Sequence, residues 1–234
     1  VPDYDLNIMK PNQTLSMITA GVLTGMDSVL EKEKPDIVLV HGDTSTTFSA
    51  ALAAFYHRIP VGHVEAGLRT YDMYSPFPEE VNRVLTGHMA ALHFAPTRRN
   101  AENLMREGID PEKIIITGNT VIDALLEVAG RPYEFEDETL KKIDFGSRRV
   151  IAVTCHRREN LGEYMRNIFE AIREVTEEFD DVEVVYPVHM NPKVRETAAE
   201  VFSGCDRIHL IEPLSYQPFV NLMAKSYFII TDSG

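Results

Sequence analysis

Cysteine is scarce in this chain of 234 residues, and long apolar runs are missing. The two cysteines, Cys155 and Cys205, are too few for a disulfide framework and lack the spacing of a zinc site. Cys155 ends an apolar run, which favours a buried thiol. No apolar stretch approaches the roughly 18 residues that a membrane span needs, and no secretory signal pattern is visible. These absences argue against a membrane-embedded or disulfide-bonded protein and favour a reducing cytoplasm.

Basic residues are also too few for a nucleic-acid-binding protein. Lys and Arg number 23 against 36 Asp and Glu, and the resulting formal net charge of −13 repels phosphate backbones. A small phosphate ligand stays compatible with this charge because it needs only local donors. The chain lacks the GxGxxG dinucleotide fingerprint, the Walker A loop and the HExxH zinc motif. We therefore expect no bound cofactor and no metal site.

Short apolar segments alternate with helical patterns along the chain, as in parallel α/β proteins. The first of them, 37–40, is entirely apolar, which predicts a strand buried on both faces. In this first block we predict strands at 37–40, 60–64, 93–95 and 114–117, and helices at 15–30, 46–56, 78–90, 97–107 and from 121 onward.

The same alternation resumes after an acidic, aperiodic segment at 130–149. We predict an interdomain connection there, between an amino-terminal domain at 1–129 and a carboxyl-terminal domain at 150–234. The predicted fold class is α/β, with two Rossmann-like, doubly wound domains whose parallel sheets face a cleft. Both chain ends fall inside βα units, so we expect a piece of a longer protein that is inactive alone. In the second block we predict strands at 150–154, 182–187, 208–211 and 227–231, and helices at 164–179, 192–202 and 216–225.

Three carboxylates follow or adjoin predicted strand ends in the first block: Asp43, Glu65 and Glu79. Because the carboxyl ends of parallel strands open onto one edge of a sheet, we expect the three to converge. Clustered carboxylates push their pKa values apart, which supplies an acid and a base. Structural alternatives remain open: Asp43 as a helix cap, Glu65 as a partner of Arg69, and Glu79 with Glu80 as dipole-stabilising residues.

A basic turn, His156-Arg157-Arg158-Glu159-Asn160, follows the strand at 150–154. Positive charge just before a helix predicts an anion site, with a solvated surface turn as the alternative. Ser233-Gly234 after the last strand resembles the start of a phosphate-binding turn. His189, in the turn after 182–187, suits a structural hydrogen bond and a ligand contact equally well.

Taken together, these segments resemble the non-hydrolysing UDP-N-acetylglucosamine 2-epimerases. The matching runs keep their order over both blocks and cover essentially the whole chain. They are HGDT at 41–44, AFYHRIPVGHVEAGLRT at 54–70, YSPFPEE at 74–80, TGNTVIDAL at 117–125, HRREN at 156–160, YPVHMNP at 186–192 and TDSG at 231–234.

The resemblance implies a GT-B fold, a homodimer and a UDP-sugar substrate. It implies interconversion of UDP-GlcNAc and UDP-ManNAc by anti elimination of UDP and its re-addition through 2-acetamidoglucal, supplying ManNAc-type sugars for surface polysaccharide. The implied acid/base residues are Asp43, Glu65 and Glu79, with His156 near the UDP phosphates. The implied substrate-binding residues are Arg69, Asn119, Arg157, Ser233 and Gly234.

Some bacterial members of this family bind a second UDP-GlcNAc as an activator. Gln13 and His189 match that site, but Asn12 stands where those members have Arg. The family's basic amino-terminal loop and the Glu after its TDSGG turn have no counterpart in this sequence. Four alternatives stay open: a 2-epimerase of another UDP-2-acetamido sugar, a hydrolysing 2-epimerase, a GT-B glycosyltransferase and a non-catalytic nucleotide-sugar-binding module.

Overall fold

The computed structural model describes residues 2–157 and 160–232. The chain divides into two compact units, residues 1–123 and 124–234, each built around a parallel sheet. This confirms the predicted α/β class with two Rossmann-like units. The boundary lies inside a helix, α5 (Thr120–Ala129), rather than after it as the sequence suggested.

Threonine side chains cap the amino-terminal ends of three helices in the first unit. Thr14, Thr44 and Thr97 each accept a hydrogen bond from a backbone N–H in the first helical turn, which satisfies a donor that would otherwise be unpaired. The elements are α1 (Leu15–Glu33), β1 (Val38–His41), α2 (Ser45–Tyr56), β2 (Val61–Val64), α3 (Glu79–Met89), β3 (Leu92–Ala95), α4 (Arg98–Arg106), η1 (Pro111–Lys113) and β4 (Ile114–Ile116).

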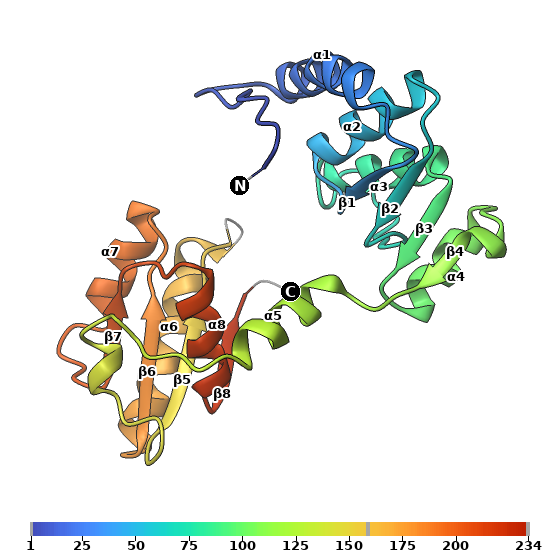
Figure 1. Ribbon diagram of the computed structural model, residues 1–234. Helices are drawn as coiled ribbons and strands as arrows, with labels where there is room; N and C mark the ends of the chain where they lie inside the picture. The colour runs from blue at the N-terminus through green and yellow to red at the C-terminus, as the bar shows by residue number, and fades with distance from the viewer. Residues whose placement is uncertain (1, 158–159, 233–234) are drawn as a thin grey trace. The chain divides into compact units, whose positions relative to one another are not determined.

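The first sheet has the strand order β1-β2-β3-β4, and all its pairs are parallel. Val40 and Val61 pack into an apolar core with Ala residues of α2, and α1 lies on α2 (Figure 1). The opposite face is open: Leu39 is 62% exposed. The expectation that the 37–40 strand is buried on both faces is therefore wrong, because the described helices pack on one face of this sheet only.

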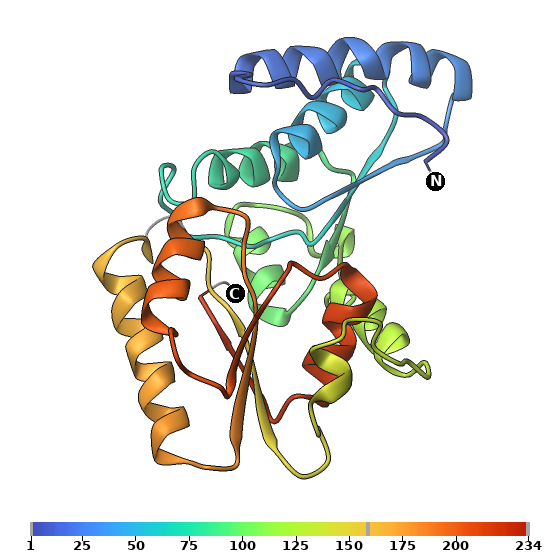
Figure 2. The same ribbon diagram turned by 90° about the vertical axis from the view of Figure 1, so that its left-hand side faces the viewer.

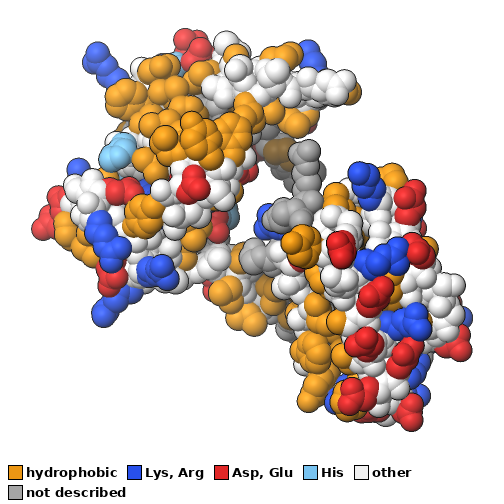
Figure 3. All heavy atoms as spheres, turned by 180° about the vertical axis from the view of Figure 1, so that it is seen from behind, with side chains coloured by type: hydrophobic (Ala, Val, Ile, Leu, Met, Phe, Trp, Pro, Cys, Tyr) orange, Lys and Arg blue, Asp and Glu red, His pale blue; other side chains and the backbone are white. Residues whose placement is uncertain are grey.

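Hydrophobic side chains gather on the surface of the first unit, whereas the second unit shows mostly mixed charges in the same view (Figure 3). The exposed apolar residues of the first unit include Leu39, Phe55, Tyr56 and Ile116.

The second sheet has the order β7-β6-β5-β8, again entirely parallel. The chain therefore winds outward from β5 through β6 to β7 and then returns to place β8 on the other side of β5. The elements are η2 (Leu140–Lys142), β5 (Arg149–Thr154), α6 (Glu163–Glu178), β6 (Val182–Pro187), α7 (Pro192–Val201), β7 (Ile208–Ile211), α8 (Tyr216–Lys225) and β8 (Phe228–Thr231).

Both faces of the second sheet are covered. Successive residues of β5 point to opposite faces, so alternate residues pack against different layers. Ile151 and Val153 pack with α6 and α7, while Val150 and Ala152 pack on the other side with Leu222 of α8 (Figure 2). The segment 130–149 also lies on this second side and buries Phe135, Leu140 and Ile143. The segment predicted as an interdomain connection thus contributes to the core of the second unit.

Candidate functional site

The second unit has a topological switch point between β5 and β8, where the chain reverses its winding direction. In open α/β sheets, ligands bind outside the carboxyl ends of the strands at such a point. His156 and Arg157 of the predicted basic turn follow β5 there, and Asp232 follows β8. The topology therefore places the predicted anion site where the fold itself predicts a ligand.

Asp232 organises this turn, and its role was missed from the sequence. One of its carboxylate oxygens, Oδ2, accepts hydrogen bonds from the backbone N–H groups of His156 (2.9 Å) and Arg157 (2.8 Å) and from Asn160 Nδ2 (3.0 Å). The Cys155 thiol donates to the same oxygen at 3.3 Å. The backbone donors of His156 and Arg157 thus hold the protein's own carboxylate. The TDSG motif already contained this residue as the first polar group after a strand.

The charges at this turn follow from burial and hydrogen bonding. Burial alone would raise the pKa of Asp232, but the hydrogen bonds from Asn160, Arg157 N, Cys155 and His156 N outweigh it and hold that pKa below its usual value. Burial and the Asp232 carboxylate raise the pKa of Cys155 to about 12. The prediction of a buried Cys155 thiol is confirmed, and this thiol is not a nucleophile at neutral pH.

The two predicted histidines of the second unit lie side by side. The rings of His156 and His189 stack with their centroids 5.2 Å apart and an angle of 11° between their planes. His189 also accepts a hydrogen bond from Asn191 N through Nδ1, so it does have a structural bond. Arg157 is exposed beside them. Ser233 and Gly234 lie outside the described residues.

In the first unit, Asp43 lies in the turn between β1 and α2. Thr44, not Asp43, caps α2, so the capping alternative for Asp43 is wrong. Its carboxylate Oδ2 instead accepts a hydrogen bond from Arg83 Nη2 at 2.6 Å, and its backbone carbonyl accepts one from Asn82 Nδ2 at 3.0 Å. Both donors come from α3, which fixes the orientation of Asp43.

Glu65 directly follows β2 with a φ of 67°, in the left-handed region that non-glycine residues rarely adopt. Such backbone strain costs about 1 kcal/mol or more and is concentrated at functional sites. The carboxylate lies 3.5 Å from His41 Nε2, and a Cβ added to Gly42 would be 3.4 Å from Glu65 Oε2. Glu65 therefore lies against the turn that carries Asp43, which brings two of the three predicted carboxylates to the same edge.

Glu79 is the first residue of α3 and is half-buried. Within the described part of the chain, its carboxylate has no hydrogen-bond or ion-pair partner. Its neighbour Glu80 is 2% exposed and accepts hydrogen bonds from Thr70 N at 3.1 Å and Tyr71 N at 2.9 Å. Glu80 is thus a structural anchor for the loop, while the Glu79 carboxylate is left available.

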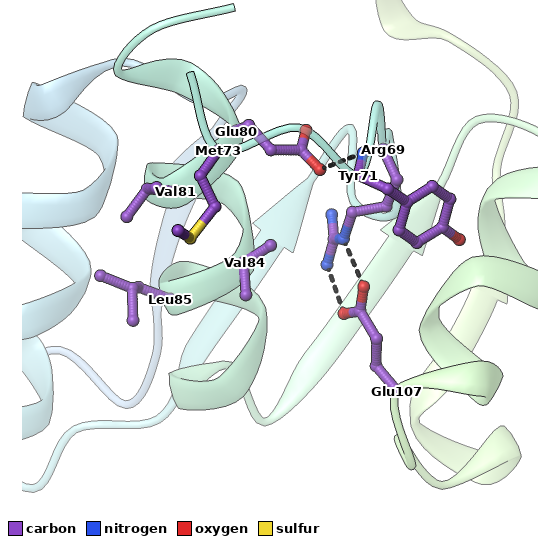
Figure 4. A pocket seen from close by; sticks show the side chains of 8 residues that line it. All are labelled: Arg69, Tyr71, Met73, Glu80, Val81, Val84, Leu85 and Glu107. Carbon is purple, nitrogen blue, oxygen red and sulfur yellow. Dashed lines mark hydrogen bonds and ion pairs between the residues drawn. The ribbon is translucent and has the colours of Figure 1, made fainter. Parts of the chain in front are cut away.

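The Arg69 side chain is fully buried and forms an ion pair with Glu107. Its Nε and Nη2 atoms donate to the two carboxylate oxygens of Glu107 at 2.6 and 2.7 Å, so the alternative in which it pairs with Glu65 is wrong (Figure 4). This pair lies beside a cavity of about 240 Å³. The cavity is lined by Arg69, Tyr71, Met73, Glu80, Val81, Val84, Leu85 and Glu107.

The remaining predicted residues make local contacts. Asn119 accepts a hydrogen bond from Val121 N through Oδ1 at the start of α5. Gln13 donates to the Ile8 carbonyl and accepts from Lys10 N, in the segment before α1. Among residues 2–157 and 160–232, no three His, Cys, Asp or Glu side chains are grouped to hold a metal ion. No helix in those ranges has the length and apolar character of a membrane span.

Comparisons with known proteins point to one family. The family model for UDP-N-acetylglucosamine 2-epimerase matches residues 1–234. The UDP-N-acetylglucosamine 2-epimerase of Bacillus subtilis is 56% identical over 233 residues, which is all of this chain and 60% of the relative. A Neisseria meningitidis UDP-GlcNAc 2-epimerase structure with bound UDP-GlcNAc is 51% identical, with a TM-score of 0.86 over 99% of this chain and 64% of that one. The chain thus spans less than two thirds of the length of these relatives.

Proposed function

Because the chain belongs to the UDP-N-acetylglucosamine 2-epimerase family, we propose that the whole native protein interconverts UDP-GlcNAc and UDP-ManNAc. The observation that carries this proposal is that Asp43 follows β1 and the strained Glu65 follows β2, with the Glu65 carboxylate against the Gly42 turn that leads to Asp43. The half-buried, unpaired Glu79 at the start of α3 supplies a third carboxylate. The structural relative from Neisseria meningitidis was solved with UDP-GlcNAc bound.

The proposed reaction needs a base and an acid and no redox step. One carboxylate takes the C2 proton of the sugar, the C–H electron pair forms the C1–C2 double bond, and the C1–O bond breaks to release UDP. A carboxylic acid then returns a proton to C2 from the opposite face while a UDP oxygen re-forms the bond to C1. Asp43, Glu65 and Glu79 are the carboxyl groups that we propose for these two roles.

The leaving UDP carries negative charge that must be stabilised as it departs. We propose that the His156 and Arg157 side chains, held by the Asp232-anchored turn, contact the diphosphate. The position of this turn at the switch point of the second sheet supports the proposal. Asn119, Arg69, Ser233 and Gly234 stay proposed substrate-binding residues, and Gln13 with His189 stays a proposed activator site. The guanidinium of Arg69 is already paired with Glu107, so we propose that Arg69 acts on the substrate indirectly.

We also propose a homodimer in the cytoplasm, feeding surface polysaccharide synthesis. The resemblance to the family motivates the dimer, and the two free cysteines are compatible with a reducing compartment. Light scattering of the whole native protein on a sizing column measures the dimer. A monomeric mass at micromolar concentration contradicts that part of the proposal.

The decisive experiment is proton NMR of the whole native protein with UDP-GlcNAc in deuterated water. The proposed mechanism requires deuterium at C2 of both UDP-GlcNAc and UDP-ManNAc. Free ManNAc as product indicates a hydrolysing epimerase instead, and a UDP-sugar that binds without C2 exchange indicates a binding module. Exchange with a different UDP-2-acetamido sugar but not UDP-GlcNAc assigns the alternative substrate.

Variants of the three carboxylates test their roles. We expect Asp43→Asn, Glu65→Gln and Glu79→Gln each to lower turnover by about 10²–10⁴, as for a lost acid or base. Glu112→Gln, at an exposed position of η1, is the matched control and should keep normal turnover. A near-normal rate for any of the first three removes that residue from the mechanism.

A further inference from the structure

Helix α3 turns a polar face inward, which reverses the usual pattern of a surface helix. Its buried residues are Glu80, Asn82, Arg83, Thr86 and Gly87, while Leu85 is 42% exposed. Burying polar and charged groups costs free energy unless each finds a partner.

Two residues of this face have Asp43 as their partner. Arg83 Nη2 donates to Asp43 Oδ2 at 2.6 Å, and Asn82 Nδ2 donates to the Asp43 carbonyl at 3.0 Å. Two adjacent α3 residues thus hold both the side-chain carboxylate and the backbone carbonyl of Asp43, one of the candidate catalytic residues. The carboxylate cannot rotate without losing a short charge-assisted bond.

Arg83 also lies near a second carboxylate, that of Glu80. Its Nη1 atom lies 3.4 Å from Glu80 Oε2, and Glu80 in turn accepts the Thr70 and Tyr71 N–H groups of the loop that follows β2. The guanidinium therefore bridges two carboxylates, and Arg83 as a whole is 8% exposed. Its Nε is buried without a partner among the described residues, a stability cost that accompanies this fixed orientation.

We propose that Arg83 is a positioning residue that fixes the Asp43 carboxylate relative to Glu79, the residue that begins the same helix. This inference rests on the proposed epimerase function. Arg83 bonds to Asp43 and so acts through it. Arginine suits this role because its planar fork contacts two carboxylates at once, which the single ammonium of lysine cannot do with the same geometry.

The test is a double-mutant cycle in the whole native protein, measured by the C2 exchange assay. Arg83→Gln should lower kcat by on the order of 10²-fold, the cost of misplacing a reacting group by about 1 Å. If Arg83 acts only through Asp43, the Asp43→Asn, Arg83→Gln double variant is no slower than Asp43→Asn alone. Losses that multiply in the double variant overturn the proposal.

Two further variants separate positioning from general damage. Arg83→Lys keeps the charge and should recover part of the lost kcat with KM nearly unchanged, and it also serves if Arg83→Gln fails to fold. Arg98→Gln, at an exposed position of α4, is the matched control and should keep the normal kcat. A lysine variant as slow as a folded Arg83→Gln variant counts against a role of the positive charge.

A readout without turnover keeps this inference separate from the proposed function. In guanidinium-selective ¹⁵N NMR, the short bond to Asp43 should slow rotation of the Arg83 Nη groups, and Asp43→Asn should abolish that slowing. Unchanged Arg83 signals in Asp43→Asn refute the pairing. A wild-type protein that shows the pairing but no C2 exchange refutes the epimerase function and leaves the contact itself standing.

Discussion

His93 should make the first unit sensitive to mild acid. It lies on β3 with no exposed surface, next to His63 of β2 in the parallel register. The pKa of His93 is lowered from 6.5 to about 4, mainly by burial and also by the nearby His63, Arg69 and Lys113. The imidazole is therefore neutral in the folded protein at every pH where the unfolded chain begins to protonate it.

The sign and size follow from proton linkage. The unfolded state binds a proton below about pH 6.5, whereas the folded state does so only near pH 4, so unfolding becomes easier as the pH falls between these values. At about 1.36 kcal/mol per pH unit, the full effect is about 3 kcal/mol. About 2.5 kcal/mol of it should be lost by pH 4.5.

Urea unfolding of the wild type and of His93→Gln, followed by circular dichroism, measures this effect. The variant replaces the imidazole with a neutral amide, and the other titrating groups cancel in the comparison. Between pH 7.5 and pH 4.5 the wild type should lose about 2.5 kcal/mol more of its free energy of unfolding than the variant does. Equal losses in the two proteins would show that His93 is hydrated or already charged when folded, and would refute the reasoning.

Three further predictions concern the second unit. Asp232→Asn should lower the free energy of unfolding at pH 7 by about 1.5–3 kcal/mol, the contribution of a hydrogen bond to a charged group. Because the pKa of Asp232 is lowered in the folded state, the difference between wild type and variant should shrink as the pH falls through that pKa. Urea unfolding of both proteins at pH 7 and pH 3 measures this change. His156→Ala should weaken UDP binding by about 1.5–3 kcal/mol in calorimetry, and unchanged affinity contradicts the diphosphate role. Iodoacetamide at pH 8 should label Cys205 well before Cys155, whose pKa is about 12, and equal labelling rates by peptide mass spectrometry contradict the buried thiol.

Local patterns in the sequence were enough to predict most of the elements. The predicted strands 182–187 and 208–211 and the helix 216–225 match β6, β7 and α8 residue for residue. Hydrophobic periodicity, Gly and Pro breakers and helix caps depend on residues within one or two helical turns, so they can be recognised in a single sequence. The same reasoning placed Asp43 and Glu65 at strand ends, and the parallel topology then brought them to one edge.

The partners of the charged residues required the tertiary structure. Arg69 pairs with Glu107, 38 positions along the chain, and not with nearby Glu65; Arg83 reaches Asp43 across 40 positions. The inward polar face of α3 and the four donors around Asp232 are equally non-local. An ion pair or hydrogen bond depends on positions within a few tenths of an ångström, which only the packed chain defines. The sequence by itself therefore determined the elements, their alternation and the chemical candidates, and the fold decided which of those candidates are held, buried or left free to react.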